Sequence, residues 1–198
     1  PTRRSSVLPL DEPVLIDGVR VRYFATGPGR RLFRSPAMGR ALKDHLPAFD
    51  VVHIHYMWVW PTTAAARAAR KAGVPYVIAP RGMLVRSLIQ GKSRLIKMLW
   101  IALFERTNIE RAAAVHVTTA AEGRQLAELD FNPKRVEVIG NGVDLTAAPP
   151  QTRGFGDYAL YLGRLSWEKG LDRLIPAMAH APRVELVIAG DGAPSYRA

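Results

Sequence analysis

Short runs of β-branched and apolar residues alternate with longer amphipathic tracts through the first three quarters of the chain. Four runs have the pattern of buried strands: Asp50–His55, Tyr76–Ala79, Ala113–Thr118 and Val136–Ile139. Three helical patterns separate them: Pro61–Gly73, Ser87–Arg111, which we expect to be bent or split, and Thr119–Leu129. Because parallel strands are joined by helical crossovers, this order predicts an α/β domain whose parallel sheet is covered on both faces.

Two smaller elements are expected before this sheet. Val14–Ile16 and Val19–Phe24 flank Asp17-Gly18, a dipeptide that favours the tight turn of a β-hairpin. Ser35 followed by Pro36 is typical of a helix N-cap and its first helical residue, so a short helix is predicted from there.

The strand and helix pattern breaks off and then restarts near the end of the chain. Thr146–Gly156 is rich in Pro and Gly, which is typical of a linker. We therefore predict a Rossmann-like domain over residues 1–145, a linker over 146–156 and a second Rossmann-like domain starting at 157. The second part, up to residue 198, holds a strand at Tyr158–Leu162, a helix that Pro176 should kink or break, and a strand at Val184–Ala189. Because one β-α-β unit leaves its sheet edges uncovered, we expect the chain to stop inside this domain.

Composition indicates a globular protein with an excess of positive charge. Hydrophobic residues make up 48% of the 198 residues, which argues against disorder over the whole length. Lys and Arg number 28 and Asp and Glu 17, and the net charge of +11 suits a nucleic acid, an acidic membrane surface or a phosphate-bearing small molecule. The chain has no Cys, no apolar run of membrane-spanning length and no signal peptide, so we expect a cytoplasmic location.

The segment Tyr161–Ile175, with the sequence YLGRLSWEKGLDRLI, carries the richest candidate chemistry. A predicted strand ends at Gly163, and Arg164 and Lys169 lie in the loop before the next helix. In open α/β sheets ligands bind at the carboxyl ends of strands, where a helix N-terminus also offers free N–H groups to phosphate. Arg164 can hold phosphate oxygens bidentately and Lys169 can add a point charge. The alternative is that both are solvated basic residues at the start of a helix.

Several segments together resemble family 4 of the glycosyltransferases, retaining enzymes with the GT-B fold. YLGRLSWEKGLDRL followed by LVIAGDG is similar to the start of that family's second domain, and VIGNGVDL, Val138–Leu145, to the segment that leads into its interdomain linker. Three more segments are similar to its acceptor domain: FDVVHIHYMW, PRGML and VTTAAEGRQL. The ordered set is more specific than any single motif.

The resemblance implies transfer of a sugar from a nucleotide-diphospho-sugar to a glycan or lipid-linked acceptor with retention, without a metal or other cofactor, as in polysaccharide biosynthesis. It assigns three residues to the donor diphosphate: Gly163, Arg164 and Lys169. It places six others on the cleft or acceptor side: His53, His55, Arg81, Gly82, Glu122 and Asn141. It assigns no catalytic residue, and Arg81 stands where many members carry a His.

The chain also departs from the family pattern. No counterpart of the N-terminal strand and its glycine-rich loop precedes the predicted hairpin, and no two glutamates are eight positions apart, although such a pair would hold the donor sugar and ribose. We therefore expect this sequence to be a fragment, truncated at both ends and inactive on its own.

Other functions have weaker support in the sequence. His53 and His55 lie two apart on one strand face, as in some metal sites, but the barrel that would supply further ligands exceeds this chain in length. His116 is expected to be structural. The Gly-x-Gly pairs lack the third glycine of a dinucleotide fingerprint. A nucleotide-sugar epimerase of the same fold and a basic nucleic-acid-binding protein remain as alternatives, although no nucleic-acid motif is present.

The tract from Arg86 to Arg111 interleaves basic and apolar residues. Such a helix can lie on an anionic membrane, so a peripheral contact at the inner face of the membrane is one interpretation. The other is a helix that packs on the sheet and exposes a basic face to solvent.

Overall fold

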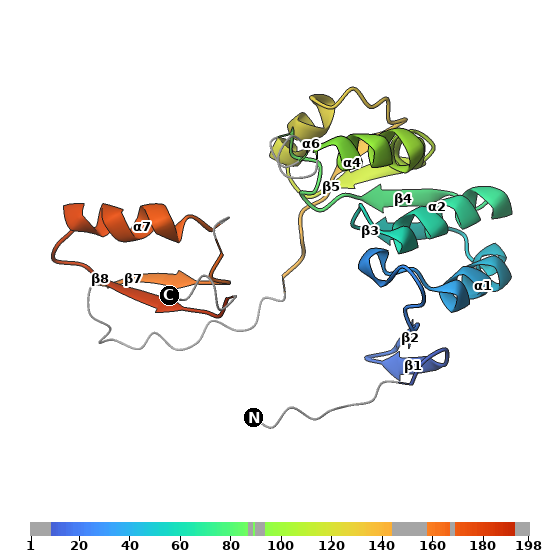
Figure 1. Cartoon of the computed structure of the whole chain (residues 1–198), viewed down its shortest axis with the longest axis horizontal. Helices are drawn as coiled ribbons and strands as arrows, with labels where there is room; N and C mark the ends of the chain where they lie inside the picture. Colours follow the sequence, from blue (N-terminus) through green and yellow to red (C-terminus); the bar gives the residue numbers. More distant parts are fainter. Residues whose placement is uncertain (1–8, 87–88, 90–93, 144–157, 167–168, 193–198) are drawn as a thin grey trace. The chain divides into compact units, whose positions relative to one another are not determined.

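The computed structural model describes residues 9–86, 89, 94–143, 158–166 and 169–192 (Figure 1). The chain divides into two compact units, residues 1–142 and 143–198, which we call unit 1 and unit 2. The predicted linker over 146–156 lies outside the described residues.

Unit 1 is built on a four-stranded parallel sheet in the order β3-β4-β5-β6. The strands are β3 (Val52–His55), β4 (Tyr76–Ala79), β5 (Ala114–Val117) and β6 (Val136–Val138). Each coincides with a predicted strand. Ile78, Val115 and Val117 are completely buried, because both neighbours and helices cover the middle strands. Burial of such side chains is the main stabilising contribution to this unit.

Three helices of unit 1 have a cap at one end that the sequence provides. They are α1 (Pro36–His45), α2 (Trp60–Ala72) and α6 (Ala120–Ala127), with the 3-10 turns η1 (Arg30–Leu32) and η2 (Leu46–Ala48). The Ser35 hydroxyl accepts a hydrogen bond from the N–H of Met38 at 3.3 Å, which is an N-cap. Gly73 ends α2 at a φ of 71°, a left-handed conformation that glycine adopts without strain.

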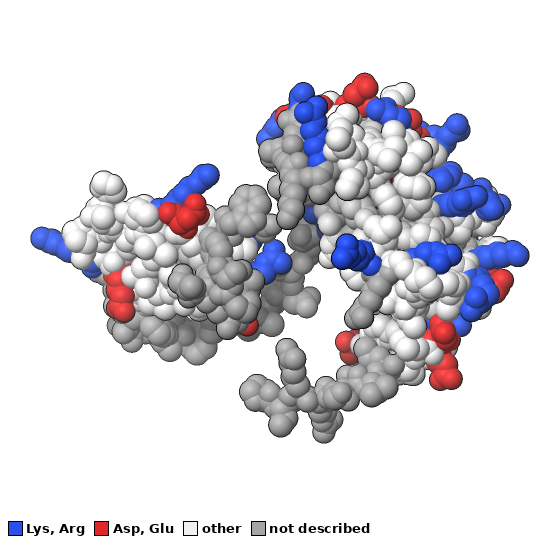
Figure 2. Space-filling view, in the orientation of Figure 1, with Lys and Arg blue, Asp and Glu red and all other residues white. Residues whose placement is uncertain are grey.

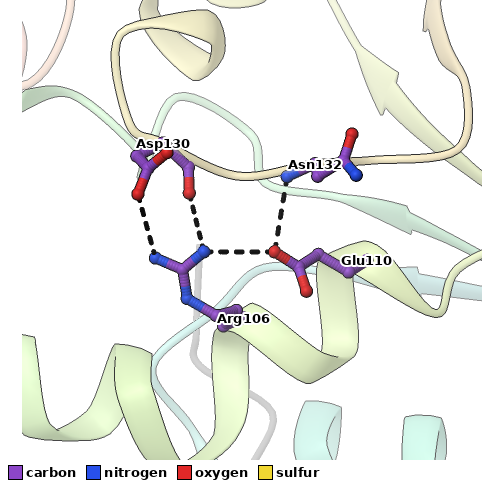
Figure 3. A network of polar contacts seen from close by, with 4 residues as sticks. All are labelled: Arg106, Glu110, Asp130 and Asn132. Carbon is purple, nitrogen blue, oxygen red and sulfur yellow. Dashed lines mark hydrogen bonds and ion pairs between the residues drawn. The ribbon is translucent and has the colours of Figure 1, made fainter.

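The predicted long helical tract contains an interruption. It comprises α4 (Arg94–Trp100), the π turn η3 (Ile101–Glu105) and α5 (Arg106–Glu110), while residues 87–88 and 90–93 lie outside the described part. Arg106 in α5 donates to Glu110 at 3.1 Å and to the Asp130 carbonyl at 2.7 Å, and Glu110 accepts from the N–H of Asn132 (Figure 3). This network ties α5 to the loop that follows α6.

A β-hairpin precedes the sheet, as predicted. β1 (Pro13–Ile16) pairs antiparallel with β2 (Val19–Arg22). Asp17 and Gly18 have positive φ values of 50° and 79°, the combination that a tight two-residue hairpin turn requires.

Unit 2 contains one β-α-β arrangement. β7 (Tyr158–Leu162) pairs in parallel with β8 (Glu185–Ala189), and α7 (Leu171–Ala177) with the 3-10 turn η5 (Met178–His180) connects them. The helix continues one residue past Pro176 and then tightens into η5, so the proline marks the end of its regular part. Among the described residues of both units, no helix has the length and apolar character needed to cross a bilayer.

Candidate functional site

Polar side chains gather at the carboxyl edge of the unit 1 sheet, where ligands of parallel sheets bind. His55 is the last residue of β3, and Arg81 and Gly82 follow β4 after Pro80. Asn141 comes three residues after the end of β6, and Glu122 lies in the first turn of α6, after β5. The structure therefore brings these predicted residues together at one edge of the sheet.

Arg81 joins the ends of three strands. Its Nε and Nη2 lie 3.3 and 3.2 Å from Nδ1 of His55, and its Nη1 donates to the side-chain oxygen of Asn141. Arg81 itself has a φ of 55°, which is uncommon for a residue with a side chain and occurs mostly where surrounding contacts hold it. The guanidinium is thus fixed at the ends of β3, β4 and β6.

The partner of His55 determines its tautomer. A guanidinium has only donors, so Nδ1 of His55 must accept and the proton of the neutral ring resides on Nε2. Burial, the cation of Arg81 and the nearby His116 together lower the pKa of His55 below its ordinary value. At neutral pH His55 is therefore a hydrogen-bond donor through Nε2.

His53 belongs to a second chain of hydrogen bonds. His116 Nε2 lies 2.8 Å from the carbonyl of Ile139, which can only accept, so its Nδ1 accepts from Nε2 of His53 at 3.3 Å in the neutral state. Nδ1 of His53 is then an unprotonated acceptor. Burial, followed by the charges of His55, His116 and Arg81, lowers the pKa of His53. The ring centroids of His53 and His55 lie 4.2 Å apart. The edge therefore carries a hydrogen-bond donor, Nε2 of His55, close to a hydrogen-bond acceptor, Nδ1 of His53.

Glu122 is buried and connects the exits of β4 and β5. It accepts hydrogen bonds from the backbone N–H of Gly82 at 2.7 Å, the N–H of Thr118 at 2.7 Å and the hydroxyl of Thr118 at 2.9 Å. Burial alone would raise the pKa of Glu122, but these three bonds and the charge of Arg81 outweigh it and lower the pKa of the carboxyl below its ordinary value. Because its oxygens are occupied, Glu122 serves to hold the two loops rather than to take up a proton.

The residues predicted to bind the diphosphate of the sugar donor, Gly163, Arg164 and Lys169, lie in the loop after β7 in unit 2. The N–H of Gly163 donates to the carbonyl of Ala189 at 3.0 Å, and the carbonyl of Arg164 accepts from the Tyr161 hydroxyl at 2.8 Å. Lys169 directly precedes Gly170, the N-cap of α7. The structure thus brings all three predicted residues to one strand-to-helix loop, although residues 167–168 lie outside its described part.

The loop after β8 needs glycine to lie this close to the loop after β7. A Cβ on Gly190 would be 1.8 Å from the carbonyl oxygen of Gly163, and one on Gly192 would be 2.3 Å from that of Leu165. The two exits also pair through the hydrogen bond from the N–H of Leu165 to the carbonyl of Asp191. The close packing of the two backbones therefore requires the glycines of the segment Ala189–Gly192.

Sequence reasoning missed three contributors to the unit 1 site. His116, which the sequence predicts to be structural, has a specific part in the site because it fixes the tautomer of His53. Thr118 supplies two of the hydrogen bonds to Glu122, and its place at the end of a predicted strand would have been a signal. Glu105 was not singled out from the sequence, but it is completely buried. Across the described residues no cluster of three or more His, Asp or Glu is arranged to hold a metal ion.

The parallel sheet of unit 1 and the β-α-β arrangement of unit 2 define a Rossmann-like α/β protein, as expected for the GT-B type. In agreement with this class, the pattern of the glycosyl transferase 4-like domain matches residues 3–142, and the chain belongs to this glycosyltransferase family. A structural comparison finds the sucrose-phosphate synthase of Thermosynechococcus elongatus, with a TM-score of 0.61 over 90% of this chain and 48% of that one, at 19% identity. This likeness supports the fold.

Curated relatives match most of this chain. A D-inositol 3-phosphate glycosyltransferase of Frankia alni is 32% identical over 96% of this chain and 53% of its own length. A protein of the same name from Mycobacterium avium is 28% identical over 91% of this chain and 48% of its own length. The chain thus spans about half the length of the curated relatives it matches.

Proposed function

We propose that this protein transfers a sugar from a nucleotide-diphospho-sugar to an acceptor hydroxyl, with retention of configuration at the anomeric carbon. The observation that carries the proposal is the match to the glycosyl transferase 4-like domain over residues 3–142. The polar edge of unit 1, with a fixed guanidinium and neutral imidazoles, is compatible with binding a hydroxylated substrate.

The proposed donor site is the loop after β7. Arg164 and Lys169 would neutralise the diphosphate, and the N-cap at Gly170 adds backbone N–H groups at the start of α7. The leaving nucleotide diphosphate gains negative charge as the glycosidic bond breaks, so preorganised cations favour the transition state. We propose that this charge stabilisation needs no metal or other cofactor.

The proposed acceptor site is the edge formed by His53, His55 and Arg81. His55 offers a hydrogen-bond donor and His53 a hydrogen-bond acceptor, a pair that suits the hydroxyl groups of a glycan or a lipid-linked sugar. A phosphorylated polyol is a second candidate acceptor, because the relatives are named D-inositol 3-phosphate glycosyltransferases and because a guanidinium binds phosphate well.

Product analysis tests this function. The experiment uses the full-length protein as it occurs in its organism, called the natural protein below. It is incubated with a panel of nucleotide sugars and with acceptors of three kinds: a glycan, a lipid-linked sugar and a polyol phosphate. A glycosylated product supports the proposal and its acceptor identifies the class. An isomerised nucleotide sugar without transfer would instead support an epimerase. Binding of a labelled oligonucleotide, with neither product formed, would support a nucleic-acid-binding protein.

We also propose a peripheral contact with an anionic membrane at its inner face, through the exposed side of α4 and η3. Leu95 is 80% exposed and Ile96 70%, and Met98, Leu99 and Leu103 are exposed as well. Large apolar side chains grouped in this way on a monomer mark an interaction site.

Charge selects an anionic membrane as the partner of this surface. α4 contains Arg94 and Lys97 and no acidic residue. Basic side chains also outnumber acidic ones on the face of unit 1 that Figure 2 shows, in line with the net charge of +11. Apolar side chains that enter the interface, with basic residues beside them, are the arrangement by which helices lie on acidic lipids.

A further inference from the structure

Glu105 is completely buried although its side chain is a carboxyl group. It is the last residue of the π turn η3. Such turns are rare inside α-helices, and those that occur often lie at functional sites. A buried carboxyl needs hydrogen-bond partners to offset the loss of water. The identity of those partners indicates what this residue does.

Glu105 bonds to residues on both sides of it in its own helical tract and to a loop distant in the sequence. Its Oε1 accepts from the backbone N–H of Trp58 at 3.0 Å and from the indole N–H of Trp100 at 2.9 Å. Its Oε2 accepts from the side-chain amide of Asn108 at 3.2 Å. The carboxyl therefore links the end of α4 and the middle of α5 to the loop that leaves β3.

This loop, Tyr56–Trp58, begins directly after His55 of the candidate acceptor edge. Tyr56 and Trp58 have φ values of 68° and 67°, a left-handed conformation that residues with side chains adopt rarely and keep only where their surroundings fix it. Each N–H in the loop has a partner: Tyr56 donates to the carbonyl of Ala79 at 3.0 Å, and Met57 to the sulfur of Met83 at 3.3 Å. Sulfur is a weak acceptor, so the carboxyl of Glu105 is the strong one at the far end of the loop.

We propose that Glu105 is a positioning residue for the acceptor edge: by holding the N–H of Trp58 it fixes the Tyr56–Trp58 loop and, through it, the end of β3 that carries His55. This inference rests on the proposed function for its kinetic consequence, but the hydrogen bond and its effect on the loop do not depend on that function.

The test compares Glu105 with Glu110, a glutamate in the next helix that serves the exposed network of Figure 3. The variants are Glu105→Ala, Glu105→Gln, which keeps one oxygen acceptor, and Glu110→Gln as the matched control. The first measurement is hydrogen exchange of the Trp58 amide in the full chain, relative to amides in β4. Glu105→Ala should accelerate this exchange about tenfold or more relative to the β4 amides, Glu105→Gln should do so less, and Glu110→Gln should leave it unchanged.

The second measurement is the kinetics of the natural protein. Glu105→Ala should raise the acceptor KM about tenfold, with the donor KM unchanged and partial recovery in Glu105→Gln. If exchange changes as expected but no variant, nor the unaltered protein, transfers sugar, then the proposed function fails while the positioning role stands. Unchanged exchange at Trp58 in Glu105→Ala, or an equal rise of donor and acceptor KM, would overturn the inference. If Glu105→Ala does not fold, the same outcomes are judged on Glu105→Gln.

Discussion

The carboxylate of Glu122 accepts a hydrogen bond from the backbone N–H of Gly82, forty residues earlier in the chain. Its other oxygen accepts from the N–H and the hydroxyl of Thr118. One side chain therefore connects the loop after β4, which carries Arg81, with the loop after β5. The position of the guanidinium depends on this connection.

Replacing this carboxylate should cost stability. Glu122→Gln places an amide N–H₂ against one of its donors, and leaving a buried donor unsatisfied costs about 2 kcal/mol. We expect the free energy of unfolding of unit 1, measured by urea denaturation, to fall by about that amount. Glu128→Gln, an exposed glutamate that follows the same helix, is the control and should change stability little. Equal effects of the two variants would contradict the assigned role.

Stability of unit 1 should fall in mild acid because of His53 and His55. The pKa of each is lowered below the ordinary histidine value of 6.5, so the unfolded chain binds more protons than the folded one below that pH. The stabilisation is complete above pH 6.5 and is lost as the pH falls through the folded-state pKa values. Glu122 adds a second loss below its ordinary value of 4.5, since its pKa is also lowered.

Two measurements check this pH dependence. NMR titration of the imidazole signals should give midpoints below 6.5 for His53 and His55. Arg81→Gln removes a neighbouring cation and should raise the midpoint of His55. Thermal unfolding of a double variant, His53→Asn with His55→Asn, should depend less on pH than that of the unaltered chain, whereas His180→Asn in unit 2 should leave the dependence of unit 1 as it is. A midpoint of His55 at or above 6.5 in the unaltered chain would contradict the account.

The sequence predicted the elements of unit 1 well, because each carries its own local signal. Short runs of β-branched and apolar residues defined β3 to β6, and Ser35 and Gly73 marked helix ends through capping chemistry. His55, Arg81 and Asn141 were singled out by the resemblance to the glycosyltransferase family, and the structure brings them together at the carboxyl edge of the sheet.

The interactions across that edge could not be predicted in the same way. The contact between Glu122 and Gly82 and that between His53 and His116 join residues far apart in the chain, and no local pattern specifies them. Glu105 was missed because one wide π turn alters which face of a helix each following residue occupies, so α-helical periodicity does not predict its burial.

Arg164 and Lys169 should matter more for turnover than for donor binding. Their charges meet the charge that develops on the leaving diphosphate, and removing one such group costs about a hundredfold in rate. In the natural protein Arg164→Ala and Lys169→Ala should each lower kcat more than they raise the donor KM. Arg164→Lys should recover only part of the activity, because an ammonium cannot reproduce the bidentate geometry.

The control for the donor loop is Arg173→Ala, an exposed basic residue on α7. It alters the net charge by the same amount as Arg164→Ala but lies outside the loop. If Arg173→Ala reduces kcat as much as Arg164→Ala does, while both variants remain folded, the positive charge acts only as a diffuse field and the loop is not the diphosphate site.

The exposed side of α4 and η3 should bind acidic vesicles, and salt should weaken this binding. We expect sedimentation with vesicles of equal parts phosphatidylcholine and phosphatidylserine and little with phosphatidylcholine alone, since each basic residue near an anionic surface contributes about 1 kcal/mol. Leu95→Gln with Leu99→Gln should weaken binding, whereas Leu15→Gln, at a position of β1 whose exposure lies between those of the two, should not. Equal sedimentation with both kinds of vesicle, or with neither, would refute the proposed contact.

The central claim is transfer of a sugar with retention, and one measurement tests it most directly. The natural protein is incubated with a nucleotide sugar of known anomeric configuration and with the acceptor panel, and the anomeric proton of the product is followed by NMR from the start of the reaction. The account predicts a new glycosidic bond with the same configuration as the donor. A product of inverted configuration would contradict retention, and an isomerised donor or no glycosidic product with any donor would contradict the proposed transferase.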